Sequence, residues 1–180
     1  MVFVHLAEGF EEIEAVAIID VLRRAGIETK SVSVTGDKNV RGSHDITVIA
    51  DILFEEADYD NCGMIVLPGG MPGAANLLAH GGLKDEIISF SEKGKYLAAI
   101  CAAPMILGEL GILKGKKATI FPGMEEKLTG AVVGADRVVT DGNIITSKGA
   151  GTAIEFALAI VGLLKSREEA EALGKRMVVR

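Results

Sequence analysis

Residues 96–111, YLAAICAAPMILGELG, are the stretch that decides the fold of this 180-residue chain. Tyr96–Ile100 is a short apolar run typical of a buried strand, and Ala102–Leu110 has the pattern of a helix that ends at Gly111. Cys101 lies between the two. A strand followed directly by a helix is the repeating unit of a mainly parallel sheet with helices on its faces. The stretch therefore predicts an α/β fold that presents a cysteine on a strand-to-helix turn.

The same alternation extends in both directions from this stretch. On its amino-terminal side we expect strands Val2–Leu6, Glu28–Val34, Thr47–Leu53 and Gly63–Leu67, a polar loop Gly36–Asp45, a helix Glu11–Ala25 and a helical region Gly73–Glu92 interrupted near His80. On its carboxyl-terminal side we expect a strand Ala118–Phe121, a hairpin of Val138–Thr140 and Ile144–Thr146 that turns at Asp141-Gly142, a helix Thr152–Leu164 and a helical segment Arg167–Met177. The first residues of that helix, Thr152–Glu155, have the pattern of a capping box. Because no repeat or Pro/Ser-rich linker interrupts the pattern, residues 1–180 are predicted to form one domain.

Composition excludes several classes of protein. The chain has 19 Lys and Arg against 25 Asp and Glu, a net charge of −6, which argues against a nucleic-acid partner. Its longest apolar run, Leu97–Leu107, is shorter than the roughly 18 residues that a membrane span requires. The first residues lack the basic region of a signal peptide, so a cytoplasmic, reducing location is predicted. Cys62 and Cys101 are the only cysteines, which excludes a disulfide scaffold and a cysteine-rich zinc site.

Cys101 is the first candidate catalytic residue. The positive end of a helix that starts at Ala102 would stabilise a thiolate and lower the thiol pKa below its ordinary value of about 8.5. Backbone N–H groups of Ala102 and of Gly70, in a Pro68-Gly69-Gly70 turn, could hold the oxyanion that forms when sulfur attacks a carbonyl. The alternative is that Cys101 is a small buried apolar residue without chemistry. Cys62 has no helix behind it, and it is predicted to be that kind of bystander.

Glu14 is the second candidate. Glu11 and Glu12 belong to the first turn of the expected helix, where its dipole favours acidic residues. Glu14 instead shares a helix face with Ile18 and Val21, so its side chain should point inward. Burial would raise its pKa and suit it to acid–base work near neutral pH. The alternative is a residue at the edge of the core with its carboxylate in solvent.

The histidines argue against several related chemistries. His5, His44 and His80 all precede Cys101, whereas a glutaminase of this architecture needs a His and a Glu after the cysteine. Position 102 is Ala, which is not the His of a related protease. No His/Asp/Glu spacing indicates a metal site, and no glycine pattern matches a complete dinucleotide motif. No metal and no cofactor are therefore predicted.

Four segments together resemble one known family, the ThiJ/PfpI superfamily, and within it the branch of the parkinsonism-associated protein deglycase. The segments are Ala7–Glu14, Ile65–Gly70, Ala98–Pro104 and Thr146–Thr152. The resemblance implies a flavodoxin-like, class I glutamine amidotransferase-like three-layer α/β sandwich that forms a homodimer. It also implies an oxidation-prone nucleophile at Cys101, a partner carboxyl at Glu14 that shares a hydrogen bond with the sulfur, and backbone donors at Gly70 and Ala102.

The chain departs from this family at two positions near the expected site. Phe121 stands where animal members tend to carry a His, so a Cys–His pair is not expected. His44 occupies what is commonly an Arg position near the dimer interface, which puts anion contacts there in doubt. The chain also ends soon after its last predicted helix, without the extra helix of some animal members.

Two functions follow from the residues and the resemblance. The first is a cofactor-free, glutathione-independent glyoxalase or protein deglycase that acts on methylglyoxal, glyoxal or early glycation adducts through Cys101 and Glu14. The second is a non-enzymatic sensor of oxidative stress or chaperone, in which the Cys101 thiol oxidises to a sulfinate. Peptidase activity is disfavoured because the necessary histidine is missing.

Overall fold

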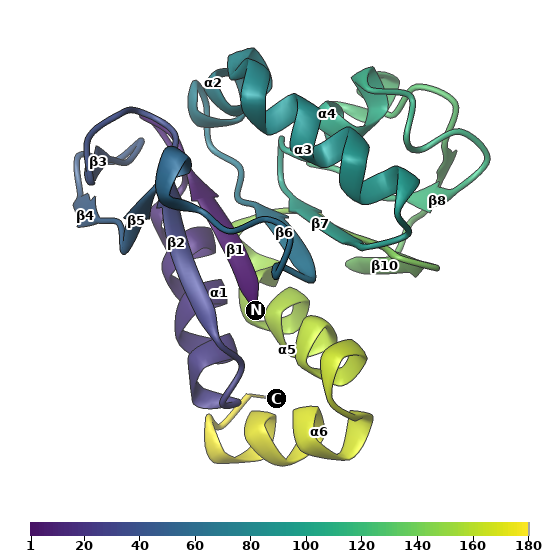
Figure 1. The fold of residues 1–180 in the computed structure, drawn as a ribbon. Coiled ribbons are helices and arrows are strands. Elements are labelled where there is room, and N and C mark those ends of the chain that lie inside the picture. Colours follow the sequence, from purple (N-terminus) through teal and green to yellow (C-terminus); the bar gives the residue numbers. More distant parts are fainter. Residues whose placement is uncertain (180) are drawn as a thin grey trace.

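The computed structural model describes residues 1–179, which form a three-layer α/β sandwich (Figure 1). Seven strands make the central sheet in the order β10-β11-β7-β6-β1-β2-β5. All neighbouring pairs are parallel except β10 with β11, which form the antiparallel hairpin. Helices cover both faces of the sheet, which confirms the predicted flavodoxin-like class of fold.

The elements have the following bounds. The strands of the central sheet are β1 Val2–Leu6, β2 Thr29–Ser33, β5 Ile52–Leu53, β6 Met64–Leu67, β7 Tyr96–Ile100, β10 Val138–Asp141 and β11 Ile144–Ser147. Two small ribbons pair β3 Asn39–Arg41 with β4 Thr47–Ile49, and β8 Lys117–Ala118 with β9 Val132–Val133. The helices are α1 Glu12–Arg24, α2 Gly73–Ala79, α3 Gly81–Glu92, α4 Pro104–Glu109, α5 Ala153–Leu164 and α6 Arg167–Arg176, and three short 3-10 turns cover Phe54–Glu56, Glu125–Lys127 and Ala150–Thr152.

Apolar side chains fill both spaces between the sheet and its helices. Successive residues of a strand point to opposite faces, and strands covered on both sides are therefore apolar throughout. Phe3 and Ile65 pack with the layer of α2, α3 and α4. Val4 and Val66 pack with the layer of α1, α5 and α6. Because β1, β6 and β7 are parallel neighbours, their carboxyl ends meet at one edge of the sheet. An open α/β sheet binds its ligands at this edge.

The predicted strand Thr47–Leu53 is wrong as one element. Its first part is β4, which pairs with β3 in a separate ribbon. Strand β3, residues Asn39–Arg41, lies inside the predicted polar loop Gly36–Asp45. Its last part pairs with β2. The chain turns between them because the Asp51 carboxylate accepts hydrogen bonds from the backbone N–H of Ser31 (2.7 Å) and from its hydroxyl (2.8 Å).

Two further predicted boundaries and one predicted helix cap differ from the structure. The helix expected from Ala102 starts at Pro104, because residues 101–103 form a turn. The strand expected over Ala118–Phe121 ends at Ala118. Thr152 does not cap α5 with its side chain, because its hydroxyl donates to the Gly149 carbonyl (2.8 Å) instead. Within residues 1–179, no helix is both long enough and apolar enough to cross a membrane.

Candidate active site

Cys101 lies on a sharp turn between β7 and α4, as predicted. Its φ of 61° is in the left-handed region, which a residue with a side chain adopts at a cost of about 1–3 kcal/mol. Two backbone hydrogen bonds hold this conformation: the Cys101 N–H donates to the Ser147 carbonyl (3.0 Å), and its carbonyl accepts from the Phe121 N–H (2.9 Å). Cys101 is partly exposed to solvent.

Glu14 is fully buried in the first turn of α1. Glu11 begins this helix, and its carboxylate accepts a hydrogen bond from the Glu14 N–H (2.7 Å). The Glu14 Oε2 atom accepts from the Gly69 N–H (2.8 Å). Glu14 also lies beside the Cys101 sulfur, whose thiol pKa its charge raises, and Oε1 has no hydrogen-bond partner within residues 1–179. The inward orientation predicted for Glu14 is therefore confirmed.

Gly69 lies between these two side chains. A methyl group placed on its Cα would lie 2.5 Å from the Cβ of Cys101 and 2.9 Å from Oε2 of Glu14. Both distances are shorter than a van der Waals contact, so only glycine permits the two groups to approach each other here. The sequence indicates the Pro68-Gly69-Gly70 turn, but it carries no local signal that Gly69 separates the Cys101 and Glu14 side chains.

The backbone N–H groups of Gly70 and Ala102 lie near enough to the Cys101 sulfur to act on its pKa, which they lower. Gly70 has a φ of 88°, and a Cβ on it would lie 2.5 Å from the backbone nitrogen of Glu11. Glycine is therefore needed for the loop to approach both α1 and the sulfur. The structure thus brings all four predicted site residues together.

The ionisation of the site differs from the prediction. Burial raises the pKa of Glu14 to about 7, and the nearby charge of Glu11 adds to this increase. Burial and the negative charge of Glu14 also raise the pKa of the Cys101 thiol to about 12, although the Gly70 and Ala102 N–H groups act in the opposite direction. The predicted low thiol pKa is therefore wrong, because the sulfur is desolvated beside a carboxylate and α4 begins only three residues later.

His44 forms a polar cluster with Glu11 and Glu12 beside the site. Its backbone N–H donates to Glu12 Oε1 (2.6 Å), and its Nδ1 lies 2.8 Å from Glu12 Oε2. Burial alone would raise the pKa of Glu12, but the hydrogen bonds from His44 outweigh it and lower that pKa to about 2. One ligand-type atom from each of the three residues lies within 4.8 Å of the others, an arrangement that sequence spacing did not indicate. These groups already bind one another.

The other histidines and the second cysteine have structural roles. His5 is completely buried, and its Nε2 lies 2.7 Å from the Tyr59 hydroxyl. His80 begins α3 and accepts a hydrogen bond from the Leu83 N–H (3.0 Å). Cys62 is 1% exposed, and its thiol donates to the Met64 carbonyl (3.1 Å). None of these groups is a main cause of the raised pKa of the Cys101 thiol.

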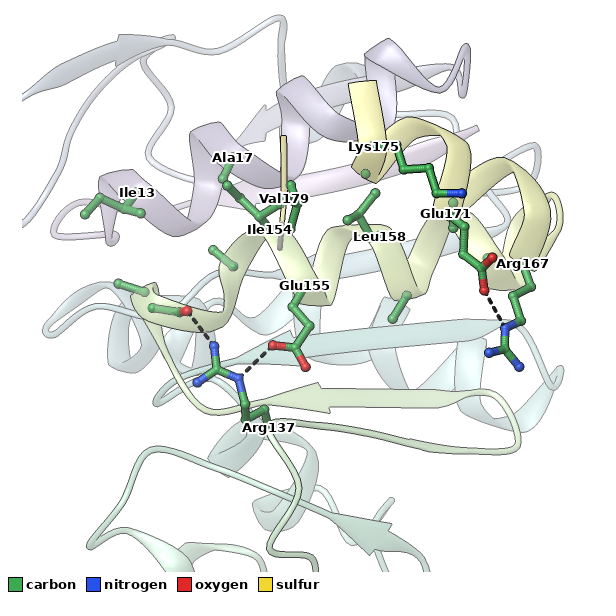
Figure 2. Close-up of a pocket in the computed structure, with 17 residues that line it drawn as sticks. Ile13, Ala17, Arg137, Ile154, Glu155, Leu158, Arg167, Glu171, Lys175 and Val179 are labelled. Carbon is green, nitrogen blue, oxygen red and sulfur yellow. Dashed lines mark hydrogen bonds and ion pairs between the residues drawn. The ribbon is translucent and has the colours of Figure 1, made fainter. Parts of the chain in front are cut away.

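A groove lies away from the thiol, on the outer face of α1, α5 and α6 (Figure 2). It has a volume of about 850 Å³ and is mainly apolar, with Ile13 and Ile154 at one end. Arg137 closes that end by pairing with Glu155 (2.7 Å) and donating to the Gly151 carbonyl (2.9 Å). Ile13 points to this outer face, whereas Glu14, the next residue, points into the protein.

Comparison with known proteins places this geometry in context. The DJ-1/PfpI family profile matches residues 1–163. The chain is 43% identical over 179 residues to Arabidopsis thaliana protein DJ-1 homolog B, covering 99% of this chain and 41% of that protein. It is 33% identical over 168 residues to a Pyrococcus abyssi protein named a deglycase, covering 91% of this chain and 99% of that protein.

The fold agrees with the sequence match. The oxidized form of Toxoplasma gondii DJ-1 superposes with a TM-score of 0.95 at 38% identity, covering 98% of this chain and 97% of that one. The chain spans less than half the length of the two Arabidopsis relatives, of which it covers 41% and 46%. With a profile match over most of its residues and full-length similarity to solved members, the chain belongs to the DJ-1/PfpI family.

Proposed function

We propose that this protein is a cofactor-free glyoxalase or deglycase that acts on small dicarbonyl compounds, or on the early adducts they form with proteins. The observation that carries the proposal is the position of Cys101, a partly exposed residue, beside a buried carboxyl whose pKa is about 7. A deglycase is also the named activity of the Pyrococcus abyssi relative. A nucleophile paired with a proton carrier of this pKa suits acid–base chemistry near neutral pH.

In the first step, the Cys101 sulfur attacks the aldehyde carbon of methylglyoxal. Because the thiol pKa is about 12, the thiol does not ionise in advance, and the Glu14 carboxylate accepts its proton during the attack. One C–S bond forms, and the C=O π bond becomes an oxyanion. The N–H groups of Gly70 and Ala102 lie near the sulfur, where they can stabilise this oxyanion. Return of the proton to the oxygen completes a neutral hemithioacetal.

In the second step, the Glu14 carboxylate removes the proton from the former aldehyde carbon. Its return to the neighbouring carbon, with the hydroxyl proton of the hemithioacetal moving in the same sense to the ketone oxygen, converts the ketone to an alcohol and the hemithioacetal to a thioester. Water then cleaves the C–S bond, which releases lactate and regenerates the thiol. Oxidation of one carbon balances reduction of the next, so no external oxidant or glutathione enters the reaction.

The test is lactate production from methylglyoxal by the purified protein and three variants. Cys101→Ser should lower kcat/KM about 10³-fold or more, and Glu14→Gln about 10²- to 10⁴-fold. Cys62→Ser is the matched control, because that thiol is buried away from the site, and it should retain the activity. Equal turnover by wild type and both site variants would show that the mechanism is wrong.

One observation also favours the second candidate function, a redox sensor. A solved relative, Toxoplasma gondii DJ-1, is known in an oxidized form. Here two molecules of hydrogen peroxide would convert the Cys101 thiol to a sulfinic acid and release two waters, with the Gly70 and Ala102 N–H groups near the new oxygens. Intact mass and peptide mapping after mild peroxide should show +32 Da at Cys101. Modification mainly at Cys62 would contradict this role.

We also propose that the chain forms a homodimer through the outer face of α1. Ile13, Val16 and Ile154 are 61%, 48% and 40% exposed, and they line two adjoining grooves there. Ile46, which is 57% exposed, extends the same surface. Sedimentation velocity should give a dimer for wild type and a monomer for Ile13→Glu, whereas Ile88→Glu on α3 should stay dimeric. A wild-type monomer at micromolar concentration would contradict the proposal.

A further inference from the structure

Phe121 is an exposed aromatic residue beside the reactive thiol. Its side chain is 47% exposed, although Ala118 and Ile120 in the same run are buried. Its backbone N–H holds the Cys101 carbonyl (2.9 Å), so the position of Phe121 is tied directly to the strained turn. An exposed phenyl group in this place has lost apolar burial, which a bound apolar group would restore.

Gly149 shows how the phenyl ring lies relative to the sulfur. A methyl group placed on Gly149 would lie 3.5 Å from Cδ2 of Phe121 and 4.0 Å from the sulfur of Cys101. A single point beside the backbone of Gly149 is thus in van der Waals range of both the ring and the nucleophile. A substituent on the carbon that the sulfur attacks would therefore reach the phenyl ring.

The charge around the sulfur is unfavourable for anionic substrates. Glu14 is the charged group that acts most strongly on the Cys101 thiol, and its charge is negative. Lys148, next to Gly149, donates its ammonium group to the Ala135 carbonyl (2.6 Å). A neutral, apolar substituent matches these surroundings better than a carboxylate or a phosphate.

We propose that Phe121 and Gly149 form an apolar wall that selects neutral 2-oxoaldehydes with an aryl or bulky alkyl substituent, the substituent packing on the Phe121 ring. Phe121 is thus a specificity-determining residue, and its proposed role rests on the glyoxalase function proposed above. An offset or edge-to-face aromatic contact contributes about 0.5–1.5 kcal/mol beyond apolar burial, so a preference of about tenfold over the unsubstituted compound is expected.

The first experiment compares kcat/KM for phenylglyoxal and for glyoxal. The ratio of the two should fall about tenfold in Phe121→Ala, fall partly in Phe121→Leu, which keeps apolar area, and be retained in Phe121→Tyr, which keeps the ring. Ile88→Ala, an exposed apolar residue on α3, is the control and should leave the ratio unchanged. An identical ratio in wild type and Phe121→Ala would overturn the proposal.

The second experiment does not depend on turnover. Iodoacetamide and N-benzyl-iodoacetamide both alkylate Cys101 by displacement of iodide, with release of the thiol proton. Their rates are followed by intact mass in a Cys62→Ala background and divided by their rates with glutathione. Wild type should favour the benzyl reagent about tenfold, and Phe121→Ala should lose this preference.

The two experiments separate the two proposals. If wild type turns over no 2-oxoaldehyde but keeps the benzyl preference, the glyoxalase function is wrong and the aromatic wall is supported. If it turns over methylglyoxal but shows no benzyl preference, the wall is wrong and the glyoxalase function stands. Circular dichroism and chemical unfolding of each variant confirm that it is folded, so that a lost preference reports on the wall.

Discussion

The two cysteines lie at opposite ends of the central sheet and in different surroundings. Cys101 follows the carboxyl end of β7, and Cys62 precedes the amino end of the neighbouring parallel strand β6. Cys101 is partly exposed, on a strained turn, in contact with Glu14. Cys62 is 1% exposed and donates its thiol proton to the Met64 carbonyl. Only the carboxyl edge of the sheet combines access with a proton carrier.

Acidity does not distinguish the two thiols. Burial raises the pKa of Cys62, and burial together with the charge of Glu14 raises the pKa of Cys101. Neither thiol is therefore a ready thiolate at neutral pH. What separates Cys101 is the adjacent carboxyl that can take its proton, together with backbone N–H groups for the charge that develops during a reaction.

The largest expected difference between the two regions is in alkylation. Iodoacetamide at pH 7 should modify Cys101 faster than Cys62, because the Glu14 carboxylate can take the Cys101 thiol proton during the attack, whereas buried Cys62 reacts only after a local opening of the structure. Peptide mapping over time measures both rates in the same sample. Comparable rates in the folded protein would contradict the comparison, and equal rates in denaturant provide the control.

The next effect concerns stability at the Cys101 region. Glu14 has a folded pKa of about 7, above its ordinary value of 4.5, so the folded protein binds more protons than the unfolded chain between these pH values. Stability should therefore fall as pH rises through this range, by about 3 kcal/mol at pH 8. Glu14→Gln, which can still accept from the Gly69 N–H, should remove that loss. Chemical denaturation should show a difference in the free energy of unfolding between variant and wild type at pH 8 and almost none at pH 4. The same difference at both pH values would refute the raised pKa of Glu14.

A matched pair of glycines tests the packing beside each thiol. Gly69→Ala should destabilise the protein by about 2 kcal/mol, since its methyl group would overlap both Cys101 and Glu14. Gly63→Ala, next to Cys62, places a methyl group 3.8 Å from the Met1 carbonyl oxygen, an ordinary contact, and should change stability by less than about 0.5 kcal/mol. Urea unfolding compares the two, and equal costs would show that the site is less closely packed than described.

The smallest effect is expected for Cys62→Ala. Loss of one buried sulfur and its hydrogen bond should cost about 1 kcal/mol of stability without changing turnover. Urea unfolding and the lactate assay measure the two properties separately. A large loss of turnover with normal stability would give Cys62 a part in the reaction and remove the contrast between the regions.

Much of the architecture is local and could be predicted. The strand at Tyr96–Ile100, the helix after Glu11 and the hairpin turn at Asp141-Gly142 follow from apolar periodicity, capping and turn residues, which act over a few positions. The sequence of Thr47–Leu53 does not reveal that this segment forms two strands, because the turn between them depends on a residue of another strand. That residue is Ser31, which donates hydrogen bonds to the Asp51 carboxylate. Likewise, Thr152–Glu155 match the sequence of a capping box, but the Thr152 hydroxyl donates to the Gly149 carbonyl and its side chain does not cap α5.

The sequence by itself determined which residues are candidates. A cysteine between a strand and a helix, an acidic residue on the apolar face of a helix, and glycines after a buried strand are all visible in the order of residues. Only the tertiary structure decided their chemistry. The pKa values of Cys101 and Glu14 depend on burial and on the distance between two segments more than 80 residues apart in the chain. Those quantities exist only after α1 packs against the sheet that contains β7, and they changed the expected thiolate into a protonated thiol beside Glu14.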